Sequence, residues 1–132
     1  MKFLFKWYCI FILIIFVTSV SGCTNQAPTN AGAAVETYFK ALVAKDSNAL
    51  VNASCASWES NALQELRTFD AVEVTLQDLK CGEIGQEGTS AIVTCSGKIV
   101  ANYGNEVLDI NLSDHTYKVI LDSNEWRMCG YQ

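Results

Sequence analysis

The spacing of apolar residues changes near Thr68, and this change constrains the fold more than any other feature of the sequence. Before Thr68, apolar side chains recur every three or four residues, which is the period of a helix with one buried face. After it they alternate with polar side chains, which is the period of a half-buried strand. Helices followed by antiparallel strands predict an α+β fold.

Three helices are expected in the first part of the chain. They cover residues 33–44, a short stretch from Ser47 to Cys55, and residues 58–66. Thr29 or Asn30 is expected to cap the first helix and Ser47 the second, because side-chain oxygens at these positions accept hydrogen bonds from free backbone N–H groups.

Four strands are expected to follow and to form one curved antiparallel sheet. They cover residues 72–81, 91–103, 107–121 and 126–131. The alternation slips at Gln77-Asp78, which predicts a bulge, and it slips again at Ser113-Asp114. Turns are expected at 82–88, which contains three glycines, at Gly104-Asn105 and at 122–124.

The first 22 residues have the pattern of an export signal. Lys2 and Lys6 give a short basic start, an apolar run covers residues 7–17, and small residues precede Cys23. The apolar run is short for a membrane-spanning helix, which needs about 20 residues. An ordinary signal peptide and an uncleaved membrane anchor are the alternatives.

The segment Val20-Ser21-Gly22-Cys23 resembles the lipobox of bacterial lipoproteins. The resemblance implies that residues 1–22 are removed and that Cys23 carries a diacylglycerol and an N-acyl chain such as palmitate. Two or more acyl chains give stable anchoring, so the protein would be held at the extracytoplasmic face of the cell membrane. Residues 23–32 would then be a flexible tether, and residues 33–132 the folded domain.

The charge balance excludes one class of partner. Removing residues 1–22 leaves 110 residues, enough for a single domain. These carry seven basic against 14 acidic residues, because Lys2 and Lys6 are the only charges in the removed part. An acidic surface without a basic run repels phosphate backbones, so no nucleic-acid partner is expected.

The order of elements resembles the cystatin-like α+β roll of the NTF2-like superfamily. The resemblance rests on the helix at 33–44, the segment Ala-Lys-Asp-Ser-Asn-Ala-Leu at 44–50, and the closing segment Glu125-Trp126-Arg127-Met128-Cys129. It implies a curved sheet wrapped around the long first helix. The resulting cone often binds a small ligand or a partner protein at its mouth.

Four cysteines remain after Cys23, an even number that favours two disulfides in an exported chain. Cys81 and Cys95 flank the glycine-rich turn, which favours a nearly local bridge between them and leaves Cys55 to pair with Cys129. Four cysteines allow three connectivities, and zinc is a further alternative. The paired C-x₂₋₄-C spacing that is usual for structural zinc is absent, so no metal is expected.

His115 is the only histidine, Asp114 precedes it, and Asp109 lies on the same predicted strand. The resemblance implies one catalytic alternative, since enzymes of this fold class often place an Asp and a His inside the cone as acid and base. A small isomerase-like or hydrolase-like enzyme using His115 with Asp109 or Asp114 is therefore the competing hypothesis. A lone histidine on a strand is more often structural, and we expect neither catalysis nor a cofactor.

Several aromatic and imidazole side chains are candidates for a pocket lining, although core packing explains them as well. They are Tyr38, Trp58, Tyr103, His115, Tyr117 and Trp126. Five acidic side chains between residues 36 and 78 are interpreted as a solvated face. They are Glu36, Glu59, Glu65, Glu73 and Asp78.

These observations together predict a membrane-anchored lipoprotein that acts as a small binding or protein-interaction module. Its partners would be the membrane, through the lipid on Cys23, and an unidentified small ligand or protein. A homodimer formed through the open face of the sheet is a further expectation.

Overall fold

The computed structural model describes Pro28 and residues 30–132. The expected signal peptide, the lipobox with Cys23, and residues 24–27 and 29 of the expected tether lie outside the described residues. Within the described part, no helix is long and apolar enough to cross a membrane. Ala31 and Gly32 belong to the first helix and not to the expected tether, because Asn30 caps the helix just before them.

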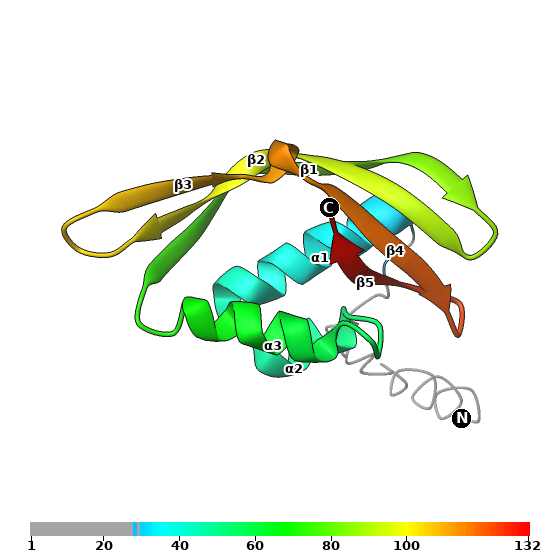
Figure 1. Cartoon of the computed structure of the whole chain (residues 1–132), viewed down its shortest axis with the longest axis horizontal. Helices are drawn as coiled ribbons and strands as arrows, with labels where there is room; N and C mark the ends of the chain where they lie inside the picture. The colour runs from blue at the N-terminus through cyan, green and yellow to red at the C-terminus, as the bar shows by residue number, and fades with distance from the viewer. Residues whose placement is uncertain (1–27, 29) are drawn as a thin grey trace, which may run out of the picture.

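Three helices precede five strands. The elements in order are α1 (Ala31–Ala44), α2 (Ser47–Asn52), α3 (Glu59–Thr68), β1 (Glu73–Glu87), β2 (Ser90–Asn102), β3 (Val107–Asn111), the short 3-10 helix η1 (Leu112–Asp114), β4 (Thr116–Asp122) and β5 (Glu125–Tyr131). The strands form one antiparallel sheet that arches over α1, as Figure 1 shows. The α+β prediction is confirmed.

The predicted four-strand sheet has five strands, because the expected strand at 107–121 is two. β3 pairs with residues 98–102 of β2, whereas β4 pairs with residues 90–94 of the same strand. η1 separates them: Leu112 is buried, and the Tyr117 hydroxyl donates to the Leu112 carbonyl at 2.7 Å. As a result β3 and the end of β2 project as an arm beyond α1 (Figure 1).

The bulge predicted at Gln77-Asp78 is confirmed. The register of β1 against β2 shifts between Gln77 and Lys80, and Asp78 has a φ of 52°. The turn predicted at 82–88 is wrong, because β1 continues to Glu87 and pairs with β2 throughout this stretch. Gly88, with a φ of 57°, begins the turn instead.

Capping residues fix the ends of the first two helices. The Asn30 side chain accepts from the Ala33 N–H at 2.8 Å, as one of the two predicted caps of α1. Asp46, and not the predicted Ser47, caps α2 by accepting from the Ala49 N–H at 2.9 Å. Each cap satisfies a backbone donor that the helix itself leaves free.

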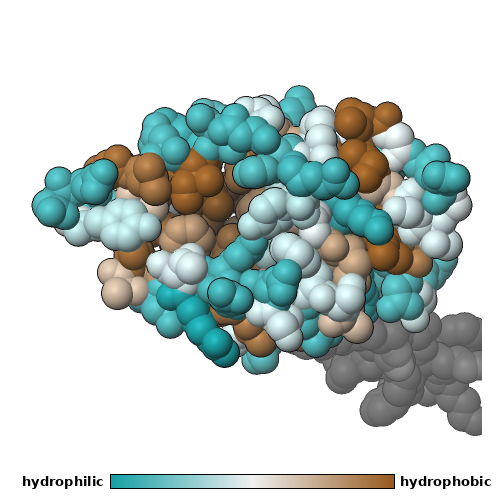
Figure 2. All heavy atoms as spheres, viewed as in Figure 1, coloured by the Kyte–Doolittle hydropathy of each residue, from teal (hydrophilic) through white to brown (hydrophobic). Residues whose placement is uncertain are grey.

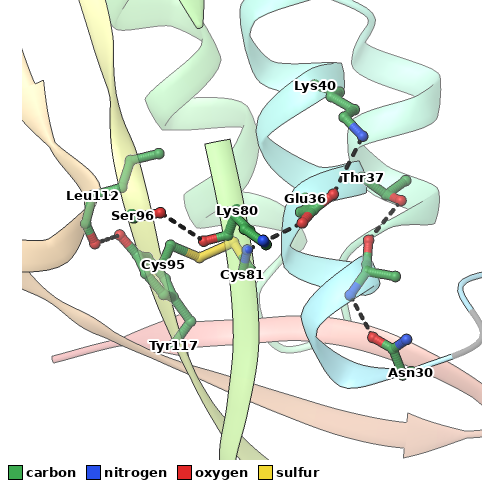
Figure 3. Close-up of a disulfide and its surroundings, with 11 residues drawn as sticks. Asn30, Glu36, Thr37, Lys40, Lys80, Cys81, Cys95, Ser96, Leu112 and Tyr117 are labelled. Carbon is green, nitrogen blue, oxygen red and sulfur yellow. Dashed lines mark hydrogen bonds and ion pairs between the residues drawn. A yellow bond between two sulfur atoms is a disulfide. The ribbon is translucent and has the colours of Figure 1, made fainter. Parts of the chain in front are cut away.

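α1 packs closely against β1 beside a disulfide (Figure 3). The Glu36 carboxylate accepts from the Cys81 N–H at 3.0 Å and pairs with Lys40 at 3.4 Å. Gly32 lies against the same stretch of β1, so a Cβ added there would meet the Cys81 carbonyl oxygen at 2.7 Å. This glycine is required by close approach of two backbones.

We expect Gly32→Ala to lower the free energy of unfolding by about 1–3 kcal/mol, the usual cost of overpacking. Alanine is the better helix former by about 1 kcal/mol, but the atom it would meet is backbone held in the sheet. Gly82→Ala is the matched control, since a Cβ there meets nothing within 4 Å. Urea unfolding of both variants checks this, and a Gly32→Ala variant as stable as the wild type would contradict it.

Two disulfides are present, Cys55–Cys129 and Cys81–Cys95, and this is the pairing that the sequence favours. The first connects the helical part to β5. Backbone bonds run beside it, from the Cys55 N–H to the Met128 carbonyl and from the Met128 N–H to the Ala53 carbonyl, both at 2.8 Å. The second joins directly opposed residues of β1 and β2.

Candidate functional site

A cavity of about 290 Å³ lies where the arm leaves the helices. Its walls come from α1, α3, the inner face of the sheet and the end of β5. They consist of Phe39, Leu42, Glu65, Thr68, Phe69, Ile99, Ile110, Asn111, Leu112, His115, Tyr117 and Tyr131. Most of this lining is apolar, and Figure 2 shows apolar surface in a hollow at the base of the arm.

The arm explains why the cavity is open. Leu108 and Ile110 on β3 are paired with Ala101 and Ile99 of β2, so they share the inner face of the sheet with two buried residues. α1 does not extend under the arm (Figure 1), and Leu108 is therefore 46% exposed. The inner face is covered at one end by helix and left accessible at the other.

Glu65 is the carboxylate of this site. It lies on α3, half-buried, and its Oε2 accepts from the Tyr38 hydroxyl of α1 at 2.6 Å. The Trp58 indole N–H in turn donates to the Tyr38 hydroxyl oxygen at 3.3 Å. Three side chains that lie apart in the sequence therefore form one chain of donors ending on a carboxylate.

The interpretation of Glu65 as part of a solvated face is wrong, and the spacing of the apolar residues around it in the sequence indicates a different position. Trp58, Ala62, Leu66 and Phe69 follow helical spacing around it, so Glu65 lies within the apolar stripe of α3. A charged residue inside such a stripe must be buried or lie at its margin. Its polarity alone suggested solvent.

Six aromatic and imidazole rings in this part of the structure form a connected series of contacts. Tyr131 is central, with ring centroids 5.5 Å from Trp58, 5.2 Å from His115 and 6.2 Å from Tyr117. Tyr117 continues to Phe39 at 5.3 Å, and Phe39 to Tyr38 at 5.6 Å. The edge-to-face arrangement of most of these pairs is the one that aromatic quadrupoles favour.

Burial and the Glu65 charge act on the tyrosine hydroxyls. Burial, and then the charge of Glu65 and the hydrogen bond to it, raise the pKa of Tyr38 far above the ordinary value. Burial likewise raises the pKa of Tyr117, and burial followed by interaction with Glu65 raises the pKa of Tyr131 to about 12. All three hydroxyls therefore keep their protons near neutral pH and act as donors.

The structure brings together four of the six predicted pocket residues. His115 and Tyr117 line the cavity, Trp58 lines the neighbouring one, and Tyr38 lies fully buried behind Glu65. Tyr103 and Trp126 lie elsewhere. Tyr103 is 49% exposed at the tip of the arm, and Trp126 is at the start of β5, packed against the core.

The two aspartates considered as partners for His115 do not line the cavity. Asp109 pairs with Lys98, which lies beside it on β2, and Asp114 is exposed. Within residues 30–132, His115 forms neither a hydrogen bond nor an ion pair with a carboxylate; its partner is the ring of Tyr131. In the same range, no three side chains of the metal-ligating types cluster.

A second, more polar cavity of about 290 Å³ adjoins the first. Glu65, Thr68 and Tyr131 line both, and Asn61 and Gln64 are added on the second side. No Lys or Arg lines either cavity, and the ion pairs found in the described part of the chain do not involve Glu65.

Comparisons with known proteins bear on the fold. No family model and no curated protein matches the chain. A proposed dehydratase of the NTF2-like family from Streptomyces avermitilis is similar in structure, with a TM-score of 0.53 and 13% identity over 74% of this chain and 87% of that one. A SEC-C motif-containing protein from Rhodopseudomonas palustris gives 0.49 and 11% over 77% and 78%.

The helical cell shape determining protein Pgp2 from Campylobacter jejuni is also similar, with a TM-score of 0.51 and 13% identity over 76% of this chain. This chain matches 38% of the Campylobacter protein, well under half of its length. At such identities the likeness concerns the fold alone. The described part of the chain has an α+β fold that is similar to that of the NTF2-like protein from Streptomyces avermitilis.

Proposed function

We propose that the chain is an extracytoplasmic, membrane-anchored lipoprotein whose domain binds a small ligand in the cavity beside Glu65 and does not catalyse a reaction. In this proposal the arched sheet is the wall of a cystatin-like cone, and the cavity is its mouth. The observation that carries it is a carboxylate that accepts a hydrogen bond from Tyr38 and lines a largely apolar cavity. Apolar walls with a few fixed polar groups are the usual composition of small-molecule sites.

The contacts of His115 support binding over catalysis. A general base needs a group that orients it and sets its protonation state, and Asp109 is engaged by Lys98 outside the cavity. The pKa values of the Tyr38 and Tyr131 hydroxyls are raised, so both groups stay protonated near neutral pH and do not act as general bases. These groups are therefore suited to binding a ligand without converting it chemically.

A cavity-blocking substitution tests the ligand-binding function. A fragment library is screened by thermal shift against the full mature protein, and hits are retested on Ile110→Trp, which fills the cavity from β3. Val107→Trp is the matched control, because Val107 is on the same strand, is 61% exposed and does not line the cavity. Fragments that stabilise the wild type and the Val107→Trp variant, but not the Ile110→Trp variant, are expected. Equal stabilisation of all three would contradict the proposal.

Lipid anchoring is tested by Cys23→Ala. We expect this variant to accumulate unprocessed or to be released, because the thiol is the atom that would be lipidated. Cys9→Ala, within the expected signal peptide, is the control and should leave the membrane-bound mature form unchanged. Fractionation and intact mass measure both variants. A Cys23→Ala protein of mature size in the membrane fraction would overturn this part of the proposal.

A further inference from the structure

We infer that the ligand is a small organic cation, an amine or a quaternary ammonium with an apolar body, whose charge lies beside Glu65. This inference deepens the proposed ligand-binding function and rests on it. Its apolar part would lie in the cavity under the arm, among Phe69, Ile99 and Ile110.

The first argument is the unbalanced charge. Among the described residues, Glu65 is the one carboxylate that lines either cavity, and no basic Lys or Arg side chain accompanies it. Tyr38 donates to Oε2, but a carboxylate has about four lone-pair sites, so it can accept further bonds. A half-buried carboxylate is stabilised by a cation, and a bound ammonium group supplies one.

The second argument is the aromatic surround. Trp58, Tyr131 and His115 line the cavities that Glu65 also lines, and the Tyr131 ring centroid lies 5.5 Å from that of Trp58 and 5.2 Å from that of His115. Ring faces attract cations by about 0.5–2 kcal/mol, depending on desolvation. A carboxylate and several rings at one place favour the same ligand charge by two different interactions.

The third argument is what the site excludes. A carboxylate or phosphate ligand would place a second negative charge beside Glu65, and no Lys or Arg lines either cavity to offset the repulsion. A wholly apolar ligand would leave the Glu65 lone pairs facing it without a donor. A neutral alcohol donates a hydrogen bond but gains neither the ion pair nor the attraction to the rings.

The position of Glu65 between the two cavities places the charged group of the ligand. Glu65, Thr68 and Tyr131 line both cavities. A cation there has its apolar substituents on the side of the arm and the more polar side chains of Asn61 and Gln64 on the other. Substituents of unequal polarity on the nitrogen are therefore accommodated.

Isosteric probes of different charge test the inference. Titration calorimetry on the full mature protein compares cyclohexylammonium, cyclohexanol and cyclohexanecarboxylate, and then choline with its neutral carbon analogue 3,3-dimethylbutan-1-ol. We expect each cation to bind at least about tenfold more tightly than its neutral partner, and the carboxylate not to bind. This ratio is measured on the wild type and does not depend on a variant that folds.

Glu65→Gln then identifies the residue responsible. It keeps the shape and an acceptor for Tyr38, so the affinity for cyclohexanol is expected to stay, while the preference for the cation falls to about twofold or less. Glu59→Gln is the matched control on the same helix, since it makes the same charge change and lines neither cavity. A cation preference that persists in Glu65→Gln would overturn the assignment.

The outcomes separate this inference from the proposed function. If cyclohexanol binds as tightly as cyclohexylammonium, the cation is overturned and the ligand-binding function stands. If cyclohexanecarboxylate binds best, the same conclusion follows. If no probe binds at millimolar concentration, the cation is again overturned, and the fragment screen with Ile110→Trp and Val107→Trp decides the proposed function by itself.

Discussion

The double substitution Cys55→Ser and Cys129→Ser is expected to lower the free energy of unfolding by about 4 kcal/mol. The disulfide joins residues 74 apart in the sequence, so it removes much of the freedom of the unfolded chain. A domain of this size has only about 5–15 kcal/mol of stability in total. Loss of this one bond therefore brings the protein close to unfolding at physiological temperature.

The second disulfide provides the control. Cys81 and Cys95 are 14 residues apart, for which the same chain-entropy estimate gives about 3 kcal/mol. Urea unfolding of the two double variants under oxidising conditions gives the comparison, with both cysteines replaced so that no free thiol is left. A Cys81→Ser, Cys95→Ser protein less stable than the Cys55→Ser, Cys129→Ser protein would contradict the argument from loop length.

The local features of this fold could be predicted from the sequence because they leave local marks. The change of period near Thr68 separates the helices from the strands, and the slip at Gln77-Asp78 coincides with the observed bulge. The glycines at 82–88 give a wrong prediction of a turn. They favour a turn locally, whereas pairing with β2 holds the segment extended. Strand formation depends on the partner as much as on the residues themselves.

Long-range pairing could not be predicted in the same way. The slip at Ser113-Asp114 shows that the strand is interrupted, but a bulge and a change of pairing position give the same slip. In the structure η1 moves the chain from one half of β2 to the other. This change of pairing position opens the space under the arm. The alternation of apolar and polar residues therefore does not predict the cavity.

The sequence predicts several aromatic residues of the site but not its carboxylate, Glu65. Tyr117 and His115 could be singled out by type, yet no pattern shows on which face Asp109 lies relative to them. The general rule that charged residues are exposed predicts a solvated position for Glu65. Its place in the apolar stripe of α3 was the better guide, because helical position fixes the direction of a side chain more firmly than its polarity does.

Raising the pH above about 10 is expected to destabilise the domain strongly, because Tyr38 and Tyr117 resist ionisation when folded. Both side chains are almost completely buried, and burial raises the pKa of each above the ordinary value of 10.0. The native state then binds more protons than the unfolded state, so stability is complete below pH 10 and falls as the pH rises. Each such tyrosine costs about 1.4 kcal/mol per pH unit, or about 5 kcal/mol for the pair at pH 12.

The slope of stability against pH identifies the residues responsible. Urea unfolding between pH 9 and 12 gives this slope for the wild type, and Tyr38→Phe or Tyr117→Phe is expected to reduce it by about one proton each. Tyr103→Phe, which removes a phenol exposed at the tip of the arm, is the matched control. Either buried variant is also expected to be less stable than the wild type at neutral pH, because a hydrogen bond is lost. That loss is the same at every pH of the series, so it does not contribute to the change in slope.

Glu65→Gln links this behaviour to the candidate site. The charge of Glu65 and its hydrogen bond both raise the pKa of Tyr38, after burial. Burial of Tyr38 remains in this variant, but without the charge the folded state should release the Tyr38 proton at a lower pH, so the slope is expected to become shallower toward the upper end of the pH range, while Glu59→Gln leaves it unchanged. A slope that is the same in the wild type, Tyr38→Phe and Glu65→Gln would mean that Tyr38 is not held as a protonated donor to this carboxylate.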